Sequence, residues 1–396
     1  MQNLMSVSYK LLKGVNESFI LRLIRQKGPI SRADIVKYTN LTAPTVTNIT
    51  NRLIESRMII EYMVGESSGG RPPVLLKMNP ESLNIIVIHL SSNKLTGYIT
   101  DGDINVINRA EHGIKDLKKD EILDLMISVI DRLKDGAAVE LPGMGIVVHG
   151  PVKAKEGISV FAPNIGWKNV PIKHMVEDRF HIPVYVENDV RAMALGEYYY
   201  GTARDVSNMV FVKVGYGVGS GLILDGKLYR GLSDSAGEIG HNTIDVSGPQ
   251  CSCGNYGCLE AMASENALVK TMVKSLKEGR DSSVVSMAAG SLEDITPEII
   301  YAAAHEGDVL AGRMLRQAAR YLGIGIANVV NTFNPEMVVI GGGIVRAESL
   351  IKDIVLETVK SRALESCYVV SDIRFSDMGD EATLKGAADM VLGEVL

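Results

Sequence analysis

The hydrophobic periodicity of the chain changes near residue 81, and this change constrains the fold more than any other feature. Before that point, apolar residues recur at helical spacing in short segments. Beyond it, strand-like apolar runs alternate with helical stretches. The runs are NIIVIHL (84–90), LTGYITD (95–101), GMGIVVHG (143–150), IPVYVEN (182–188), NMVFVKVG (208–215), SGLILDG (220–226) and EMVVIGGGI (336–344), and the helical stretches include 120–134, 265–279 and 308–331. We predict a helical head over 1–80 and an α/β body with two lobes and a cleft.

Charge separates the same two parts of the chain. The whole sequence has a net charge of −6, but residues 1–80 carry 11 Lys and Arg against 5 Asp and Glu. The remainder carries 30 basic and 42 acidic residues. This asymmetry is typical of a protein in which only the head contacts phosphates, although a solvated helical surface could carry the same excess.

The head has the pattern of a winged helix-turn-helix domain. A first helix ends at Gly28-Pro29, Ser31 can cap a short second helix with Asp34 as its partner, and Thr42 can cap a third. Two strand-like runs then flank GESSGGRPP (65–73), as in a wing.

The polar face of the third helix and the wing tip favour double-stranded operator DNA as the partner. The candidate DNA contacts are Thr42, Pro44, Thr45, Thr47, Asn48, Asn51, Arg52 and Arg71. Such three-helix units also serve in protein contacts, which stays the alternative.

Three of the four cysteines lie within eight positions, as Cys251, Cys253 and Cys258. Structural zinc takes four tetrahedral ligands, often three Cys and one His, and His241 lies ten residues upstream. We predict a structural Zn²⁺ site, in which Glu238 supports His241; three thiols without a metal are the alternative. The chain has no apolar run that suits a signal peptide or a membrane span, so we expect a cytoplasmic protein with reduced cysteines and no membrane partner.

Carboxylates and glycines in the body suggest a small-molecule site. Asn188, Asp189, Glu238 and Glu260 are suited to bind neighbouring hydroxyls of a polyol. The segments VGYGVGSG (214–221) and IGGGI (340–344) could admit phosphate, although glycine turns are common in α/β folds.

Five ordered motifs, ENDVRAMALGE, AGEIGH, CSCGNYGCLE, NPEMVVIGGGI and GDEATLKGAA, resemble the ROK family of repressors and sugar kinases. The basic head with SSGGRPP resembles the repressor branch, and TIDVSGPQCSCGNYGCLEAMASENAL is particularly similar to xylose repressors. The resemblance implies a winged head (1–80) on an actin-like sugar-kinase body, assembled as a homodimer or homotetramer. Its first lobe would span 81–190, with about 377–396 packing back, and its second lobe 191–376.

The resemblance also implies a set of sugar contacts. They are Gly150, Asn164, Asn188, Asp189, Glu238, His241 and Glu260. Asp189 holds the position of the general base in the kinases. Where the kinases have phosphate loops, this chain has His89, Ser91-Ser92 and Tyr216.

Because phosphoryl transfer depends on positioning and charge neutralisation around the nucleotide, we predict a sugar-responsive repressor and no enzyme. Xylose or another mono- or oligosaccharide would be its effector. The alternatives are an active sugar kinase with an added head, and a DNA-binding protein without a sugar effector.

Overall fold

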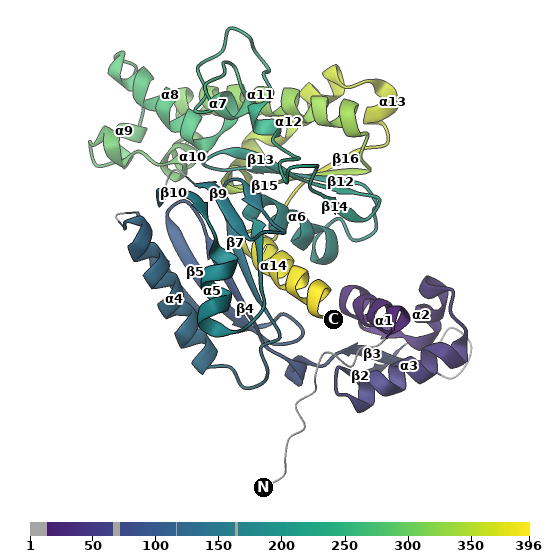
Figure 1. Ribbon diagram of the computed structural model, residues 1–396. Helices are drawn as coiled ribbons and strands as arrows, with labels where there is room; N and C mark the ends of the chain where they lie inside the picture. The colour runs from purple at the N-terminus through teal and green to yellow at the C-terminus, as the bar shows by residue number, and fades with distance from the viewer. Residues whose placement is uncertain (1–13, 66–71, 116, 163–164) are drawn as a thin grey trace. The chain divides into compact units, whose positions relative to one another are not determined.

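The computed structural model describes residues 14–65, 72–115, 117–162 and 165–396, which form two compact units (Figure 1). The first unit contains the chain up to Ala192 together with Thr383–Leu396, and the second is Met193–Ala382. The separation of the head from the first lobe stays a prediction. Within the described ranges, no helix combines the length and the apolar character that a membrane span needs.

The N-terminal part of the first unit has three helices and a small sheet, which fit a winged helix-turn-helix (Figure 1). Its elements are α1 (Val15–Lys27), β1 (Ile30–Ser31), α2 (Arg32–Thr39), α3 (Ala43–Glu55), β2 (Ile59–Val64) and β3 (Val74–Met78), with the antiparallel strand order β1-β3-β2. The predicted caps are present: Ser31 Oγ accepts from the Asp34 amide at 3.1 Å, and Thr42 Oγ1 accepts from the Thr45 amide at 3.4 Å. The helix starts predicted from capping chemistry are therefore confirmed.

A five-stranded mixed sheet forms the centre of the remaining first unit. Its strands are β4 (Ile85–Leu90), β5 (Lys94–Thr100), β6 (Val106–Gly113), β7 (Met144–Val148) and β11 (Val184–Asn188), in the order β11-β7-β4-β5-β6. A three-stranded sheet, β8 (Val152–Lys153), β9 (Ile158–Ala162) and β10 (Trp167–Val170), and the helices α4 (Lys119–Asp135) and α5 (Ile172–Phe180) complete this part. Figure 1 shows α4 and α5 on one face of the five-stranded sheet and the last helix, α14 (Asp380–Val395), on the other.

The last helix contacts both the sheet and the head within the first unit. A Cβ added at Gly145 of β7 would lie 3.1 Å from Val391 and 3.2 Å from the Ala387 carbonyl oxygen, so glycine allows this close approach. Arg25 of α1 forms an ion pair with Asp389 of α14, with Nε and Oδ1 3.0 Å apart. Both side chains are buried, at 3% and 5% exposure. The C-terminal helix α14 is thus held against α1 by a buried ion pair.

The second unit repeats the sheet plan of the first. Its strands are β12 (Met209–Val214), β13 (Val218–Leu224), β14 (Lys227–Tyr229), β15 (Met337–Gly341) and β16 (Asp372–Phe375), in the order β14-β13-β12-β15-β16. In both sheets a central strand has an antiparallel meander on one side and two parallel strands on the other. This duplicated plan is that of the actin-like sugar-kinase fold.

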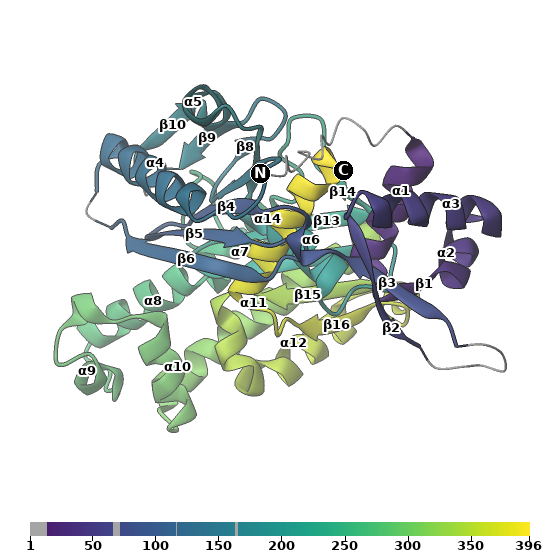
Figure 2. The same cartoon turned by 90° about the horizontal axis from the view of Figure 1, so that it is seen from below.

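Seven helices lie in the second unit beside this sheet, within the described residues. They are α7 (Leu259–Ala263), α8 (Glu265–Lys277), α9 (Val284–Met287), α10 (Pro297–His305), α11 (Val309–Phe333), α12 (Glu348–Arg362) and α13 (Glu365–Tyr368). Figure 2 shows α11 and α12 side by side. A Cβ at Gly323 would lie 2.5 Å from Thr358 Cβ, so glycine lets these two helices pack closely. A further helix, α6 (Asp189–Tyr200), carries the chain from the first unit into the second.

The seven strands and three helices predicted in the body are all confirmed, with ends that differ by a few residues. The predicted strands did not include β6, β14, β16 or the sheet of β8, β9 and β10. In β6 only Ala110 is fully buried, and β8 has two residues, so neither presents the apolar run or strict alternation that marks a strand.

Candidate functional site

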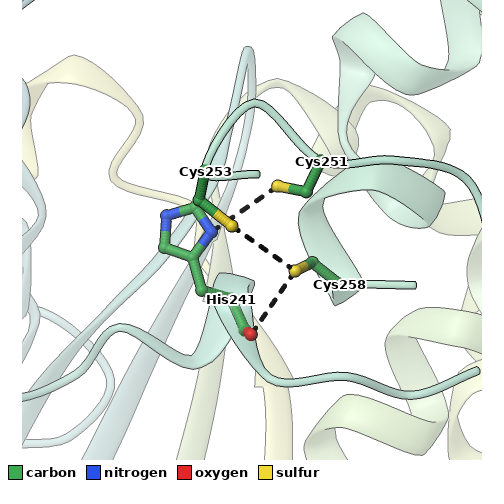
Figure 3. A group of neighbouring side chains, drawn as sticks. All are labelled: His241, Cys251, Cys253 and Cys258. Carbon is green, nitrogen blue, oxygen red and sulfur yellow. Dashed lines mark hydrogen bonds between the residues drawn. The ribbon is translucent and has the colours of Figure 1, made fainter. Parts of the chain in front are cut away.

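The three clustered cysteines and His241 lie together in the second unit. Their candidate ligand atoms all lie within 4.8 Å of one another, and Figure 3 shows the four side chains facing a common space. His241 belongs to a short 3-10 turn, Ile239–His241, and Cys258 directly precedes α7. The structure therefore brings together the four residues that the sequence spacing predicts as ligands, and the cluster could hold a metal ion.

The distances in this cluster suit a tetrahedral ion. Cys253 Sγ and Cys258 Sγ are 3.8 Å apart, and Cys251 Sγ is 3.7 Å from His241 Nδ1 (Figure 3). Metal–sulfur bonds of about 2.3 Å place the corners of a tetrahedron about 3.8 Å apart. The donor set, three sulfurs and one imidazole nitrogen, is one that zinc favours.

A tight loop presents the thiols, and two of its glycines are required by the backbone. Gly254 and Gly257 have φ values of 93° and 64°, in the left-handed region that favours glycine. A Cβ at Gly257 would also lie 1.6 Å from the Asp245 carbonyl oxygen. The Cys251 amide donates to Asn255 O at 2.8 Å and closes the loop. Backbone hydrogen bonding within the loop thus holds the segment between the predicted ligands in place.

The thiols differ in their electrostatic environment. Burial raises the pKa of Cys258 to about 12, and the hydrogen bonds that its thiol donates to Cys253 and Cys251 add to this effect. A backbone hydrogen bond from Asn255 lowers the pKa of Cys253, which is exposed. Without a cation the buried Cys258 stays protonated at neutral pH, and a bound cation would favour its thiolate.

The cluster of three cysteines and His241 is linked through Ser252 to Glu260, one of the predicted sugar contacts. Glu260 lies in α7, where its Oε2 accepts from the Val218 amide at 3.1 Å and its Oε1 accepts from Ser252 Oγ at 3.4 Å. Ser252 lies between two of the cysteines. Glu238, the other predicted carboxylate of this unit, is exposed, and its carbonyl oxygen accepts from the His241 amide at 3.1 Å. Support of the His241 ring by the Glu238 carboxylate stays a prediction.

In the first unit, two of the predicted sugar contacts, Asn188 and Asp189, lie where β11 ends and α6 begins. Asn188 Nδ2 donates to the Gly150 carbonyl oxygen at 3.0 Å and to Asp189 Oδ1 at 3.3 Å. Asn188 Oδ1 accepts from the Val190 and Arg191 amides at 3.0 and 3.1 Å, as a helix cap does. The side-chain amide of Asn188 therefore forms hydrogen bonds within the protein. One of them orients the buried carboxylate of Asp189, which is 2% exposed.

The carbonyl of Gly150 is itself placed by its backbone. Its φ of 83° favours glycine, and a Cβ there would lie 2.3 Å from the Phe161 carbonyl oxygen. Two predicted contacts, Asn164 for sugar and Arg71 for DNA, lie outside the described residues.

A buried ion pair beneath this site was not predicted from the sequence. Glu187 Oε1 lies 2.9 Å from Arg191 Nε, and the two side chains are 0% and 4% exposed. Glu187 Oε1 also accepts from the Asn188 amide at 2.8 Å. The sequence signal that could have predicted this pair is the i, i+4 spacing of Glu187 and Arg191.

The predicted DNA-contacting face of α3 is open to solvent. Pro44, Thr47, Asn48, Asn51 and Arg52 are exposed, as is the capping Thr42, and Thr45 is half-buried. Arg52 Nη2 pairs with Glu17 Oε2 at 2.6 Å. Arg52 is thus held against α1 in this structure.

Comparison with known proteins decides the family. The ROK family model matches residues 85–394. The chain belongs to the ROK family. It is 35% identical over 394 residues to a xylose repressor of Caldicellulosiruptor bescii, and the match covers 98% of each chain.

Two solved ROK structures show both branches of the family. A ROK transcriptional regulator, a homologue of the Escherichia coli protein MLC, matches with a TM-score of 0.82 at 33% identity and covers 96% of this chain and 97% of that chain. A ROK glucokinase from Streptomyces griseus, in complex with glucose and AMPPNP, matches with a TM-score of 0.69 at 28% identity. That match covers 78% of this chain and 98% of the glucokinase. This ROK protein is therefore similar to a regulator over 96% of its length and to a kinase over 78% of its length.

Proposed function

We propose that the protein is a sugar-responsive transcriptional repressor that acts on carbohydrate-utilisation genes in the cytoplasm. The observation that carries the proposal is the match to a xylose repressor over 98% of both chains, which includes the exposed polar face of α3. The fold adds a body of the sugar-kinase type, whose carbohydrate-binding chemistry suits an effector. Xylose is the first effector to test, followed by other mono- and oligosaccharides.

The N-terminal part would bind operator DNA through α3 and the wing. The proposed contacts are Thr42, Pro44, Thr45, Thr47, Asn48, Asn51, Arg52 and Arg71. The short hydroxyl and amide side chains suit base edges and phosphates, and the arginines suit phosphates. A homodimer would place two α3 helices in successive major grooves of a palindromic operator, and a homotetramer would hold two such pairs.

Each unit of the chain carries proposed sugar contacts. In the first unit these are Gly150, Asn164, Asn188 and Asp189, and in the second they are Glu238, His241 and Glu260. Asp189 is the strongest candidate, because its carboxylate is buried and oriented by Asn188. A sugar that binds one conformation of the body more tightly would shift the population and thereby change operator affinity.

The metal would be a structural Zn²⁺ held by His241, Cys251, Cys253 and Cys258. It would fix the loop that carries Ser252, whose hydroxyl contacts Glu260. We assign it no chemistry in a reaction, since all four tetrahedral positions are filled by protein ligands.

We further propose that the protein does not transfer phosphate. The first phosphate loop of the kinases would correspond to the turn between β4 and β5, where this chain has Ser91-Ser92 and the Ser91 amide donates to the Lys94 carbonyl oxygen at 2.9 Å. In the second loop, Tyr216 stands at the position of the kinases' threonine, and its side chain is 58% exposed. The rival is an active sugar kinase with a DNA-binding head, which the Asp189 carboxylate favours.

Operator binding measured against a panel of sugars tests the proposal. Selection from a random DNA pool first gives a binding sequence, and fluorescence anisotropy then gives its Kd with each sugar. We expect one sugar to change the Kd, and we expect Asp189→Asn to abolish that response without loss of operator binding. A coupled assay with ATP and the same sugars separates the rival, because a kinase would show turnover that Asp189→Asn removes.

A further inference from the structure

Two glycine turns of the second unit lie at the carboxyl ends of neighbouring parallel strands. β12 leads into Gly215 and β15 ends at Gly341, and the two strands pair in parallel with Lys213 opposite Gly341. Gly342 has a φ of 90°, and a Cβ there would lie 2.4 Å from the Val214 carbonyl oxygen. Ligands of α/β sheets bind outside such strand ends, and glycine turns let backbone amides approach an anion.

A carboxylate of the chain itself occupies the space between these turns. Glu265 is the first residue of α8, and its backbone amide donates to the Gly215 carbonyl oxygen at 2.8 Å. A Cβ added at Gly343 would lie 1.9 Å from Glu265 Oε1, and one at Gly215 would lie 3.7 Å from Oε2. The carboxylate therefore contacts the second turn and approaches the first, and Gly343 is required for it to fit.

The carboxylate is held in this position by a buried tyrosine. Tyr301 of α10, which is 2% exposed, donates its hydroxyl hydrogen to Glu265 Oε1 at 3.0 Å. Arg346, the nearby arginine, forms an ion pair with Glu298. Burial raises the pKa of Glu265, and the Tyr301 hydrogen bond opposes that effect. The position of Glu265 is thus set by a backbone bond to Gly215, in the turn after β12, and by a side-chain bond from Tyr301 of α10.

We propose that Glu265 excludes the phosphate groups of nucleotides from the space between the two glycine turns. A phosphate oxygen there would overlap the carboxylate oxygens, and its negative charge would be repelled by them. The chain thus has both glycine turns, but the Glu265 carboxylate occupies the position that an anion would take between them. This inference rests on the proposed function in one respect, that the phosphate loops no longer serve phosphotransfer.

Substitution of Glu265 tests the inference directly. We expect no binding of ADP or of a non-hydrolysable ATP analogue, with Mg²⁺, to the wild-type chain in calorimetry at millimolar ligand. Glu265→Gly removes both the bulk and the charge and should bind ADP roughly tenfold or more tightly than wild type. Glu265→Gln, which keeps the bulk, should gain less. Glu278→Gln, after the other end of α8, is the control and should behave as wild type.

The outcomes separate this inference from the proposed function. Wild-type protein that binds ADP as tightly as Glu265→Gly would overturn the inference. A Glu265→Gly chain with wild-type thermal stability that still binds no ADP would also overturn it, and Glu265→Ala provides the same test if the glycine variant folds poorly. Nucleotide binding by the wild-type chain without turnover refutes the exclusion alone, whereas turnover of ATP with a sugar by the wild-type chain refutes the non-enzymatic proposal.

Discussion

Asp389→Asn is expected to loosen the contact between the first helix of the chain and the last. Arg25 of α1 and Asp389 of α14 form an ion pair in which neither side chain is more than 5% exposed. The variant keeps the size of Asp389 and removes its charge, so the guanidinium of Arg25 stays buried without its counter-charge. The hydrogen bond from Arg22 to the Gly393 carbonyl oxygen, at 3.3 Å, links the same two helices and is exposed.

The expected magnitude follows from this burial. Removing one partner of a buried ion pair costs about 3 to 5 kcal/mol, because the remaining charge is left in a medium that solvates it poorly. If α1 opens locally, about 3 kcal/mol increases the open population roughly a hundredfold. Replacing both residues by apolar side chains, in Arg25→Met with Asp389→Leu, should recover most of the loss, since no charge is then buried.

Hydrogen exchange of the α1 amides measures this effect. We expect α1 to exchange roughly a hundredfold faster in Asp389→Asn than in wild type, and the double variant to exchange at a rate closer to wild type. Asp372→Asn is a matched control, because the Arg374–Asp372 pair is 49% exposed at both residues and should contribute no more than about 1 kcal/mol. Equal α1 exchange in Asp389→Asn and wild type would refute the reasoning.

Three further changes have expected outcomes. Cys253→Ser should lose bound metal on elemental analysis while Cys367→Ser retains it, and equal metal content in the two variants would remove Cys253 from the ligand set. Arg71→Ala should weaken operator binding and lower the salt dependence of log K by about one unit, and an unchanged slope would show that Arg71 contacts no phosphate. Burial raises the pKa of Glu265, so the folded state favours the protonated form of this carboxyl. The stability of wild type relative to Glu265→Gln should therefore be greatest below the ordinary carboxyl pKa. It should decline as the pH rises through the raised pKa of the folded state. Thermal midpoints of both proteins across pH 4 to 8 check this, and parallel curves would contradict it.

The elements that could be predicted from the sequence are those whose signals are local. Ser31 and Thr42 mark the starts of α2 and α3 because a cap acts on an amide three residues away. The metal ligands could also be predicted, since Cys251, Cys253 and Cys258 lie in one short loop and His241 shortly before it.

The features that could not be predicted depend on residues that are distant in the sequence. The Arg25–Asp389 pair joins opposite ends of the chain, and each residue alone resembles an ordinary charged helix position. Glu265 has the pattern of a carboxylate that favours a helix N-terminus. Only the structure shows that Gly343, which follows β15 far along the chain, leaves room for it.

The reciprocal effect of sugar and operator on each other's binding tests the central claim most directly. Calorimetric titration of the effector sugar into free protein and into the protein–operator complex gives two sugar Kd values. If the body senses sugar for the DNA-binding head, these values differ by the same factor by which saturating sugar changes the operator Kd, because coupling between two sites is reciprocal. Identical sugar Kd values in the two titrations would contradict the account.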